Sequence, residues 1–575
     1  MSTTYDSIEN GNVTPRSKFE RWVTLEELKL DMSDKELKTL IQRWISIAWQ
    51  SEGVLQTEGD VNKQYYIWYD KRTEDIMDDK SKVTDNRIFT DIETIVPLVT
   101  STPAKPVVFI PWAQGKEKAK KEQIRSQAIK TQKILIAIYE DQKLQQKYEK
   151  MVRQHQLYRI WMIKYWIDND QIFADVVLPP RLLLDSEAVS MEDSEFIWQK
   201  IVDTARNLIN KYPDKEDEIS GKVQGKLWTK ITYIEWWTDE FMVVSIDADC
   251  ILDKKKNPLF DYTWVPQITY DESGKEIKWE PTKNNYFVRP KKPFIPFNVY
   301  NIGENILDET TALIQCKSLQ DNINDRKRQI ADNCDVAWNP IRTYRGLTED
   351  QADMANEDLR AWDGVNLTEE QEISYVQATP LPNFITNDLQ DSRNAIDNIF
   401  GIHSTTRGER QWGESWRARE ALREGDEDRQ ATIWRAIEQV SEELYNAFAH
   451  LIKVFYDKPQ LIPIMWKDNA EDYVEFKRDD IADWMKIRVK PGSTIPEDKN
   501  SLKAQAIELL RLNALPRRRA FEMMGMEDAE EVAKEIELQD VKAQQEQQKL
   551  LEKEQAEKSK KVTRNTLEEQ IANLA

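Results

Sequence analysis

The sequence predicts an α+β protein that is mostly helical, in which a mixed N-terminal body is followed by a long helical core. Two observations predict this class. Short apolar and aromatic runs bounded by turn residues, which are typical of strands, recur between residues 158 and 288. Apolar residues at helical spacing then dominate residues 308–332, 383–400 and 414–456. A chain of 575 residues is long enough for several domains and a sizeable core.

The N-terminal body is expected to begin with a helix. Residues 1–25 are polar, and residues 33–36 (Ser-Asp-Lys-Glu) form a capping box ahead of an apolar stripe that ends at Trp49. A long helical region is expected from Lys116 toward Ile167. Its Lys-rich first turns indicate a solvated helix face rather than a binding patch.

The body then changes to shorter elements. The sequence predicts strands at 158–165, 172–178, 181–184, 225–237, 241–246 and 286–288, a helix at 196–210, and turns at 253–258 and 271–275. Aromatic residues are frequent here, and the 20 tryptophans of the chain fit either a large aromatic core or large interfaces.

The helical core begins after a Pro-rich linker at 291–296. Within the helix predicted at 308–332, the apolar residues form a narrow, near-heptad stripe: Leu313, Cys316, Leu319, Ile323 and Ile330. Most other positions are polar. This pattern predicts a helix that packs against copies or partners rather than inside a globule.

A compact insert separates this helix from the next. Strands are expected at 341–344 and 372–377, with a helix at 349–359 between them. The helix predicted at 383–400 places Ile385, Leu389, Ile396 and Ile399 on one face. A polar loop at 403–413 (HSTTRGERQWG) follows it.

The longest predicted helix ends at Tyr456 and has the most regular apolar spacing, at Ile433, Ile437, Val440, Leu444, Phe448, Leu451 and Phe455. Its first half is charged on nearly all sides and contains Gly425, which costs about 1 kcal/mol relative to Ala. That half is either a solvated helix or one that bends where it crosses a lumen. Strands are then expected at 461–466, 473–476 and 485–490, helices at 501–514 and 517–537, and a polar helical tail after Asp540.

The charge balance argues against tight nucleic-acid binding. Lys and Arg number 81 against 102 Asp and Glu, so the net charge is −21. A protein that holds nucleic acid statically by its phosphates needs a basic excess or patch. Contact with nucleic acid that slides past remains compatible with an acidic wall.

The three cysteines, Cys250, Cys316 and Cys334, have no CxxC spacing, so neither a disulfide framework nor a zinc site is expected. The polar first residues lack the apolar segment of a secretory signal. No apolar stretch approaches the length of a membrane span, and no membrane association is expected.

No catalytic motif, metal site or cofactor site is predicted. Residues 221–226 (GKVQGK) have the wrong spacing for a P-loop and lack the Ser or Thr after the Lys. The histidines His155, His403 and His450 are far apart in sequence. Asp247 and Asp249 form the best carboxylate pair, although such a pair is more often a turn feature than a metal site.

The order of segments resembles the portal proteins, or head-to-tail connectors, of tailed bacteriophages. Four stretches carry the resemblance: 292–332 with its Pro-rich approach and Gln-Asp-x-x-Asn helix, 394–408 (NAIDNIFGIHSTTRG), the long helix through Tyr456, and 487–498 (IRVKPGSTIPED). Together they cover most of residues 290–540, whereas the N-terminal half matches only in general character.

The resemblance implies a portal-type fold that assembles as a ring of twelve copies at one capsid vertex. It divides the chain into an N-terminal arm (1–25), a wing (26–300 and 457–499), two stem helices (301–333 and 383–400), a clip (334–382), a tunnel loop (401–413), a long wing-spanning helix (414–456), and a crown with a C-terminal helical tail (500–575). Such a protein is a structural component of the virion, not an enzyme, and is assembled in the cytoplasm of the bacterial host.

The resemblance also implies partners: the major capsid protein, the terminase large subunit during packaging, head-to-tail adaptor or neck proteins, and double-stranded DNA that slides through the lumen. Three sets of residues are expected to make the contacts. They are His403, Arg407, Glu409, Arg410, Gln411 and Trp412 in a DNA-facing tunnel loop; Asp325, Arg326, Lys327 and Arg328 on the stem channel; and Trp338, Arg342, Tyr344 and Trp362 in the clip. We hypothesise that Arg407 and Arg410 touch phosphates transiently while Trp412 anchors the loop.

Two other functions stay open at this point. One is a capsid or tail scaffold through which no DNA passes. The other is a metal-dependent nuclease that uses Asp247 and Asp249. Images of the purified protein separate them from a portal, because only a portal needs a ring whose central hole admits duplex DNA.

Overall fold

A computed structural model gives the fold. It describes residues 33–67, 81–109, 118–247, 250–262, 268–270, 276–279, 285–338, 341–350, 368–376, 380–402, 406, 416–465, 471–482, 485–494, 499–512, 515–524, 532–533, 535–539 and 548. The chain divides into two units, Met1–Ile495 and Pro496–Ala575. The described part of the second unit contains the helices α13 (Lys499–Arg511) and α14 (Arg517–Met523), which contact each other.

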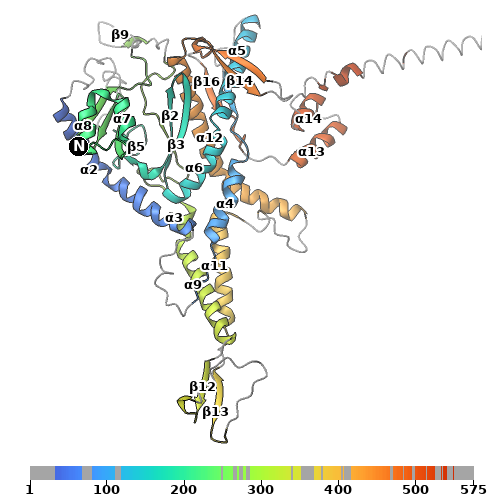
Figure 1. The fold of residues 1–575 in the computed structure, drawn as a ribbon. Helices are drawn as coiled ribbons and strands as arrows, with labels where there is room; N and C mark the ends of the chain where they lie inside the picture. Colours follow the sequence, from blue (N-terminus) through green and yellow to red (C-terminus); the bar gives the residue numbers. More distant parts are fainter. Residues whose placement is uncertain are drawn as a thin grey trace, which may run out of the picture. The chain divides into compact units, whose positions relative to one another are not determined.

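A five-stranded antiparallel sheet forms one part of the first unit (Figure 1). Its strands follow chain order: β4 (Leu182–Leu184), β5 (Ile197–Thr204), β6 (Lys230–Trp237), β7 (Phe241–Ile246) and β8 (Cys250–Lys256). Because side chains alternate along a strand, neighbouring residues enter different cores. Trp236 packs on one face and Trp237 on the other, so both faces of the sheet are covered.

An N-terminal helical segment covers the face that carries Trp236. Its first helix, α2 (Asp34–Glu52), makes this contact. The π-helical turn η3 (Gly53–Glu58) and α3 (Gly59–Ile67) follow, and α3 packs on α6 instead. The predicted capping box is confirmed, since the Ser33 N–H donates to the Glu36 carboxylate at 2.9 Å. Trp44 of α2 lies against Trp236, with ring centroids 5.6 Å apart.

The opposite face of the sheet meets short helices and a second sheet. Between β5 and β6 lie α7 (Ala205–Lys211), η6 (Pro213–Lys215) and α8 (Glu216–Lys222), and η5 (Pro179–Arg181) precedes β4. The second sheet has the order β11 (Phe294–Phe297), β2 (Trp161–Asp168), β3 (Gln171–Val177) and is antiparallel. Lys164 of β2 links the two sheets, because its Nζ donates to Glu235 at 2.5 Å and to Gln199 at 2.7 Å.

Helices pack on the other side of this second sheet. They are α4 (Arg87–Thr100), α5 (Lys118–Asp141), α6 (Leu144–Tyr158) and the long α12 (Trp416–Phe455). The predicted apolar stripe of α12 is confirmed, with Ile433, Ile437, Val440, Leu444, Phe448 and Leu451 all buried. Trp434, Tyr445 and Ala449 are buried as well, so this half of α12 is enclosed on nearly all sides.

A pair of antiparallel helices extends the same core. These are α9 (Ala312–Trp338) and α11 (Asn383–Phe400), which lie side by side and are joined through the hairpin of β12 (Ile341–Arg345) and β13 (Glu372–Val376) (Figure 1). Three further two-stranded antiparallel sheets complete the described strands: β1 (Pro106–Phe109) with β16 (Lys486–Val489), β9 (Ile268–Tyr270) with β10 (Glu276–Trp279), and β14 (Gln460–Met465) with β15 (Glu471–Phe476). The short η7 (Arg478–Asp480) follows β15.

Most predicted elements of the helical core are confirmed, including the bounds of α11. The expectation that the α9 stripe faces other copies is wrong for its buried part, because Leu313, Cys316 and Ile323 lie in the main core of the first unit. Of the face predicted for α11, Leu389 and Ile396 are buried but Ile399 is 42% exposed.

The helix predicted at 196–210 is wrong in its first half, which forms β5. Ile197, Ile201, Ala205 and Leu208 have helical spacing, and all four do pack on one core cluster. The strand forms because residues 197–204 pair with all of β6. Thr204 then caps α7 by accepting the Asn207 N–H at 3.3 Å.

Three other predictions in the body are also corrected. The turn expected at 253–258 is largely the edge strand β8. The strand expected at 286–288 does not form, since the N–H groups of Tyr286 and Phe287 donate to His450 Nδ1 at 3.2 and 3.1 Å rather than to a strand. The long helix from Lys116 breaks at Lys143, whose φ is 50°, and ends at Tyr158. None of the helices described is long and apolar enough to cross a membrane.

The contact between α3 and α6 gives a test of packing. A Cβ added at Gly59 would lie 2.0 Å from Tyr158 Cδ1, whereas one added at Gly53 meets nothing within 4 Å. Gly59→Ala is therefore expected to lower the free energy of unfolding by about 1–3 kcal/mol, measured as a lower thermal midpoint. The control Gly53→Ala should be neutral or stabilising by up to about 1 kcal/mol. Equal midpoints for the two variants would contradict this packing.

Candidate functional site: the helix pair, its junction and the loop base

The helix pair is held together by polar as well as apolar contacts. Asn322 of α9 donates to Ser392 of α11 at 2.9 Å, and Arg326 Nε donates to Asp388 at 2.7 Å. The apolar contacts come from the buried residues of both helices. Polar pairing at this seam lets two largely solvated helices keep one register.

A cluster of charged residues joins the pair to α4. The Arg87 guanidinium donates to both carboxylate oxygens of Asp397, with Nε and Nη2 each 2.8 Å from their acceptors. Asp91, one turn further along α4, is fully buried, and its carboxylate lies 3.8 Å from Arg87 Nε. Gln320 of α9 completes the junction by accepting the Arg87 N–H at 3.0 Å.

One guanidinium therefore faces two carboxyl groups. Burial, together with the charge of Asp397, raises the pKa of the Asp91 carboxyl well above its usual range, against the opposing effect of Arg87. Asp91 thus keeps its proton at neutral pH, while Asp397 carries the charge that pairs with Arg87. With one proton held by the two carboxyl groups, the remaining negative charge balances that of Arg87.

The residues predicted for the stem channel lie beside this junction, and each basic one faces a carboxylate. Arg326 pairs with Asp388, Lys327 lies 4.0 Å from Asp85, and Arg328 lies 3.4 Å from Asp325. Asp85 also accepts from Arg393 of α11. Arg326 therefore joins the two helices of the pair, Lys327 faces the segment before α4, and Arg328 pairs within α9. The sequence pattern did not indicate these roles.

The base of the 403–413 loop is fixed by the first part of α12. Helix α11 ends at Gly401, whose φ is 68°, with the Ile402 N–H donating to the Asp397 carbonyl at 2.9 Å. Arg429 and Gln430 of α12 donate to the carbonyls of Asn398 and Phe400 at 2.6 and 2.7 Å. These side chains cap a helix end whose carbonyls otherwise lack partners.

One residue within the loop is described: the Thr406 hydroxyl donates to Asp426, which is buried. All six residues predicted to form the DNA-facing tunnel loop (His403, Arg407, Glu409, Arg410, Gln411 and Trp412) lie outside the described residues. The structure thus describes how the loop is anchored, and the contacts of its tip stay a prediction.

The hairpin of β12 and β13 exposes most of its surface. Trp338, at the end of α9, is 86% exposed, and Tyr375 is 56% exposed. Arg342 is exposed and lies opposite Tyr375 in the register, while Tyr344 is half-buried opposite Ile373. Of the four predicted clip residues, Arg342 and Tyr344 thus lie on β12 and Trp338 at the end of α9, while Trp362 lies outside the described residues.

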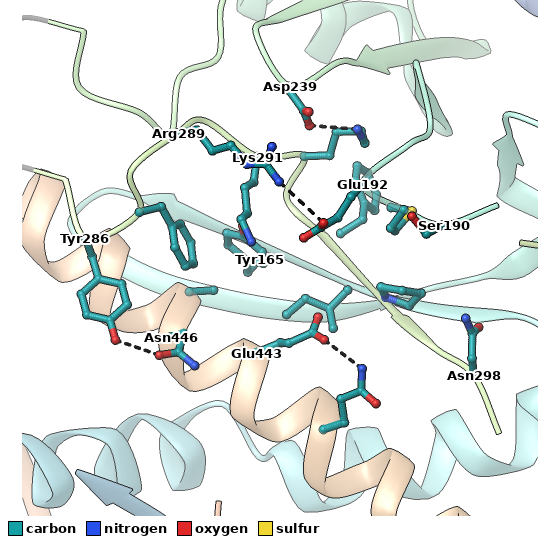
Figure 2. Close-up of a pocket in the computed structure, with 18 of the residues that line it drawn as sticks. Tyr165, Ser190, Glu192, Asp239, Tyr286, Arg289, Lys291, Asn298, Glu443 and Asn446 are labelled. Atoms are coloured by element: carbon teal, nitrogen blue, oxygen red, sulfur yellow. Dashed lines mark hydrogen bonds and ion pairs between the residues drawn. The ribbon is translucent and has the colours of Figure 1, made fainter. Parts of the chain in front are cut away.

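A cavity of about 560 Å³ lies between the second sheet, α12 and residues 189–192 (Figure 2). Three cations and three carboxylates line it: Arg289, Lys291, Lys292, Glu192, Asp239 and Glu443. Lys292 Nζ donates to Asp239 at 2.8 Å, and Arg289 lies 3.6 Å from Glu192. The lining therefore contains equal numbers of cationic and acidic side chains, and two of the cations are paired with acids of the same lining.

The groups considered for catalysis serve the fold. His155 and Glu309 are buried 3.0 Å apart, and the same Glu309 oxygen accepts the Val299 N–H. Burial lowers the pKa of His450 to about 4, so the ring is neutral and accepts backbone N–H groups. Asp247, with φ of 54°, pairs with Lys222 at 3.5 Å, and Asp249 lies outside the described residues. The described residues contain no cluster of three or more candidate metal ligands.

Comparison with known proteins decides the family. The model of the phage P22-like portal protein family matches residues 120–575, well over half of the chain. The chain belongs to this family. Portal proteins of this family are structural components rather than enzymes. No curated protein is similar enough in sequence to match the chain.

Solved structures give weaker likenesses. A chain from the neck of the empty GTA particle, computed with C6 symmetry, has a TM-score of 0.36 and 9% identity over 80% of this chain and 95% of that one. A chain from the virion of the native gene transfer agent (GTA) particle has a TM-score of 0.36 and 10% identity over 80% of this chain and 94% of that one. A chain from the neck of the native GTA particle, computed with C12 symmetry, has a TM-score of 0.35 and 8% identity over 77% of this chain and 90% of that one. These values are too low to argue for a shared function.

The polar junction of this P22-like portal protein was not predicted from its sequence. Arg87 and Asp397 are 310 positions apart. A single Asp at 91 in an otherwise apolar helix face was the one available signal, because a lone acid on such a face needs a buried partner.

The protonated Asp91 gives a pH test. The folded protein holds a proton that the unfolded chain releases above pH about 4. The free energy of unfolding should therefore fall by up to about 1.4 kcal/mol per pH unit as the pH rises from there toward the raised pKa. Asp91→Asn, which cannot ionise, is expected to flatten this slope in denaturant titrations between pH 5 and 9.

Asp388→Asn is the matched control, because the Arg326 hydrogen bond lowers the pKa of Asp388. That carboxylate is ionised throughout the same pH range, so its removal should change the stability but not the slope. A wild-type slope in Asp91→Asn would show that Asp91 does not hold the proton.

Proposed function

We propose that this chain forms a dodecameric ring at one capsid vertex, and that the ring is the channel through which double-stranded DNA is packaged and ejected. Membership of the P22-like portal family over residues 120–575 carries the proposal. The ring also docks the terminase large subunit during packaging and the head-to-tail adaptor or neck proteins afterwards, and it contacts the major capsid protein. Its place is the virion, after assembly in the bacterial host cytoplasm.

We assign the regions as the sequence predicts. The helix pair α9 and α11 is the stem, the β12–β13 hairpin belongs to the clip, and α12 spans the wing. The junction at Arg87 supports this assignment, since a stem that carries load between a wing and a clip needs a fixed attachment. The loop anchored by Arg429 and Gln430 is then the tunnel loop, and α13 and α14 belong to the crown.

The exposed hairpin supports the clip assignment. A two-stranded hairpin alone is marginally stable in water, and in this one Arg342, Arg345, Ser374, Tyr375 and Val376 are all exposed. Neighbouring copies in a ring would cover these exposed side chains and add contacts to the hairpin. An exposed Trp next to the hairpin is the kind of residue that dominates interface energetics.

Electron microscopy of the purified full-length protein tests the ring. Rings with a hole that admits duplex DNA are expected, and Trp338→Ala should reduce the fraction of rings by about tenfold or more, as loss of an interface hot spot does. Trp228→Ala is the matched control, since Trp228 is 73% exposed but lies in the segment before β6. A compact monomer that cleaves DNA with Mg²⁺ would overturn the proposal in favour of a nuclease.

The tunnel loop is tested by the charge of its tip. Reversal of both cations, Arg407→Glu with Arg410→Glu, places four additional units of negative charge in each copy beside the sliding duplex. The amount of DNA packaged and retained per particle should fall severalfold because phosphates are repelled. The control Lys226→Glu with Lys230→Glu makes the same change on exposed residues elsewhere. Normal packaging by the loop variant would refute the role of these arginines.

A further inference from the structure

The ribbon of β1 and β16 separates its side chains into two unlike faces. Val107 lies opposite Arg488 and Phe109 opposite Lys486, and the Lys490 N–H extends the pairing by donating to the Lys105 carbonyl at 3.1 Å. Residues opposite one another share a face of the sheet. One face therefore carries Lys105, Val107, Phe109, Lys486, Arg488 and Lys490.

The other face anchors the ribbon. Ile487 and Val489 are buried in the main core. Two side chains of α12 hold the backbone of β16: Glu442 accepts the Val489 N–H at 3.2 Å, and Asn446 donates to the Ile487 carbonyl at 3.3 Å. The outward face is thus a fixed platform, not a mobile loop.

The outward face is basic and open. Lys105, Lys486, Arg488 and Lys490 are all exposed, and we call these four residues the basic ribbon face. Phe109 on the same side is 50% exposed. The chain as a whole has a net charge of −21, so a face that bears four cations and no acid differs in sign from the chain's overall charge.

Among the described residues, these cations take no part in ion pairs that hold the fold. In the part of the chain that the structure describes, none of the four side chains has a carboxylate within 4 Å. Nearby Lys130 does, at 2.7 Å from Asp480. The closest acids of α12 are engaged with backbone instead, as Glu438 accepts the Thr494 N–H at 3.4 Å. A ligand could bind the four cations without breaking an existing ion pair.

We propose that the basic ribbon face binds the phosphate backbone of duplex DNA, as a contact separate from the tunnel loop. Alternate residues of a strand are about 6.7 Å apart, which is comparable to the distance between successive phosphates of one DNA strand. Lys486 and Arg488 of β16 follow this spacing, and Lys490, directly after the strand, continues it. The inference rests on the proposed function, because a portal channel brings duplex DNA, a polyanion, to the chain.

The composition of the face favours DNA over an acidic protein. It offers cations and apolar surface, and cations bind the phosphates that every DNA sequence carries, so most of the binding energy would not depend on sequence. A regular row of like charges on a flat ribbon fits a ligand with regularly repeated negative charge. An acidic protein segment would instead need partners placed for its own side chains.

The test uses the full-length protein, a fluorescent duplex of mixed sequence, and several NaCl concentrations. Each phosphate contact contributes about 0.9 to the slope of log affinity against log salt. The triple variant Lys486→Gln, Arg488→Gln, Lys490→Gln is expected to make this slope shallower by about 2–3 and to weaken binding at low salt at least tenfold. The control Lys222→Gln, Lys226→Gln, Lys230→Gln removes the same charge from exposed residues and should leave the slope unchanged.

Single variants keep the test decisive if the triple variant fails to fold. Arg488→Gln in β16 and Lys105→Gln directly before β1 should each lower the slope by about one. An unchanged slope in all ribbon variants would overturn the inference, and so would an altered oligomer size with unchanged DNA binding, which would make the face a contact between copies. Images of the same samples keep the two proposals apart, because rings with an unchanged salt slope would refute only the inference.

Discussion

The C-terminal half of α12 is the constraint on which the first unit depends. A helix this apolar on nearly every side is stable only when other elements enclose it, and β2, β11, β16, α4 and α5 all pack on it. The few polar side chains it buries must therefore find partners: Ser441 donates to the Tyr148 hydroxyl at 2.8 Å, and the neutral ring of His450 bonds to backbone groups of residues 259, 286 and 287. The enclosing strands are positioned by α12, and the basic ribbon face is one result.

The helix pair is attached by a different kind of interaction. Its outer parts are largely solvated, so the apolar contacts of Leu313, Ile323 and Ile396 cannot alone fix its direction. The bidentate pair of Arg87 and Asp397 fixes the direction of α11 relative to α4, because two parallel hydrogen bonds restrain the angle between the two groups. Because two carboxyl groups lie beside one guanidinium, Asp91 holds a proton. The stability of the attachment therefore depends on pH.

The sequence predicted the parts that depend on local periodicity and not those that depend on long-range partners. The bounds of α11, the stripe of α12 and the capping box at Ser33 followed from spacing alone. The helical spacing of apolar residues gave a wrong prediction at β5. Two of these residues lie on the strand and two on the following helix, yet all four pack in the same core: Ile197, Ile201, Ala205 and Leu208. Spacing also could not reveal that His450 would take the N–H groups of residues 286 and 287, or that Arg326 and Lys327 would meet carboxylates from other elements. The contacts of the loop tip and of Trp362 lie outside the described residues.

The outer strand β8 ends in Lys254, Lys255 and Lys256, and it forms one edge of the five-stranded sheet. An edge strand presents unpaired backbone groups on which another chain can add a strand. Successive lysines point to both faces of the sheet, so a second β8 brought alongside would meet like charge above and below. Copies of the chain that gathered at high local concentration in the proposed ring would thereby be kept from joining through their sheets. The charge at this edge would protect the order of assembly rather than the stability of the single chain.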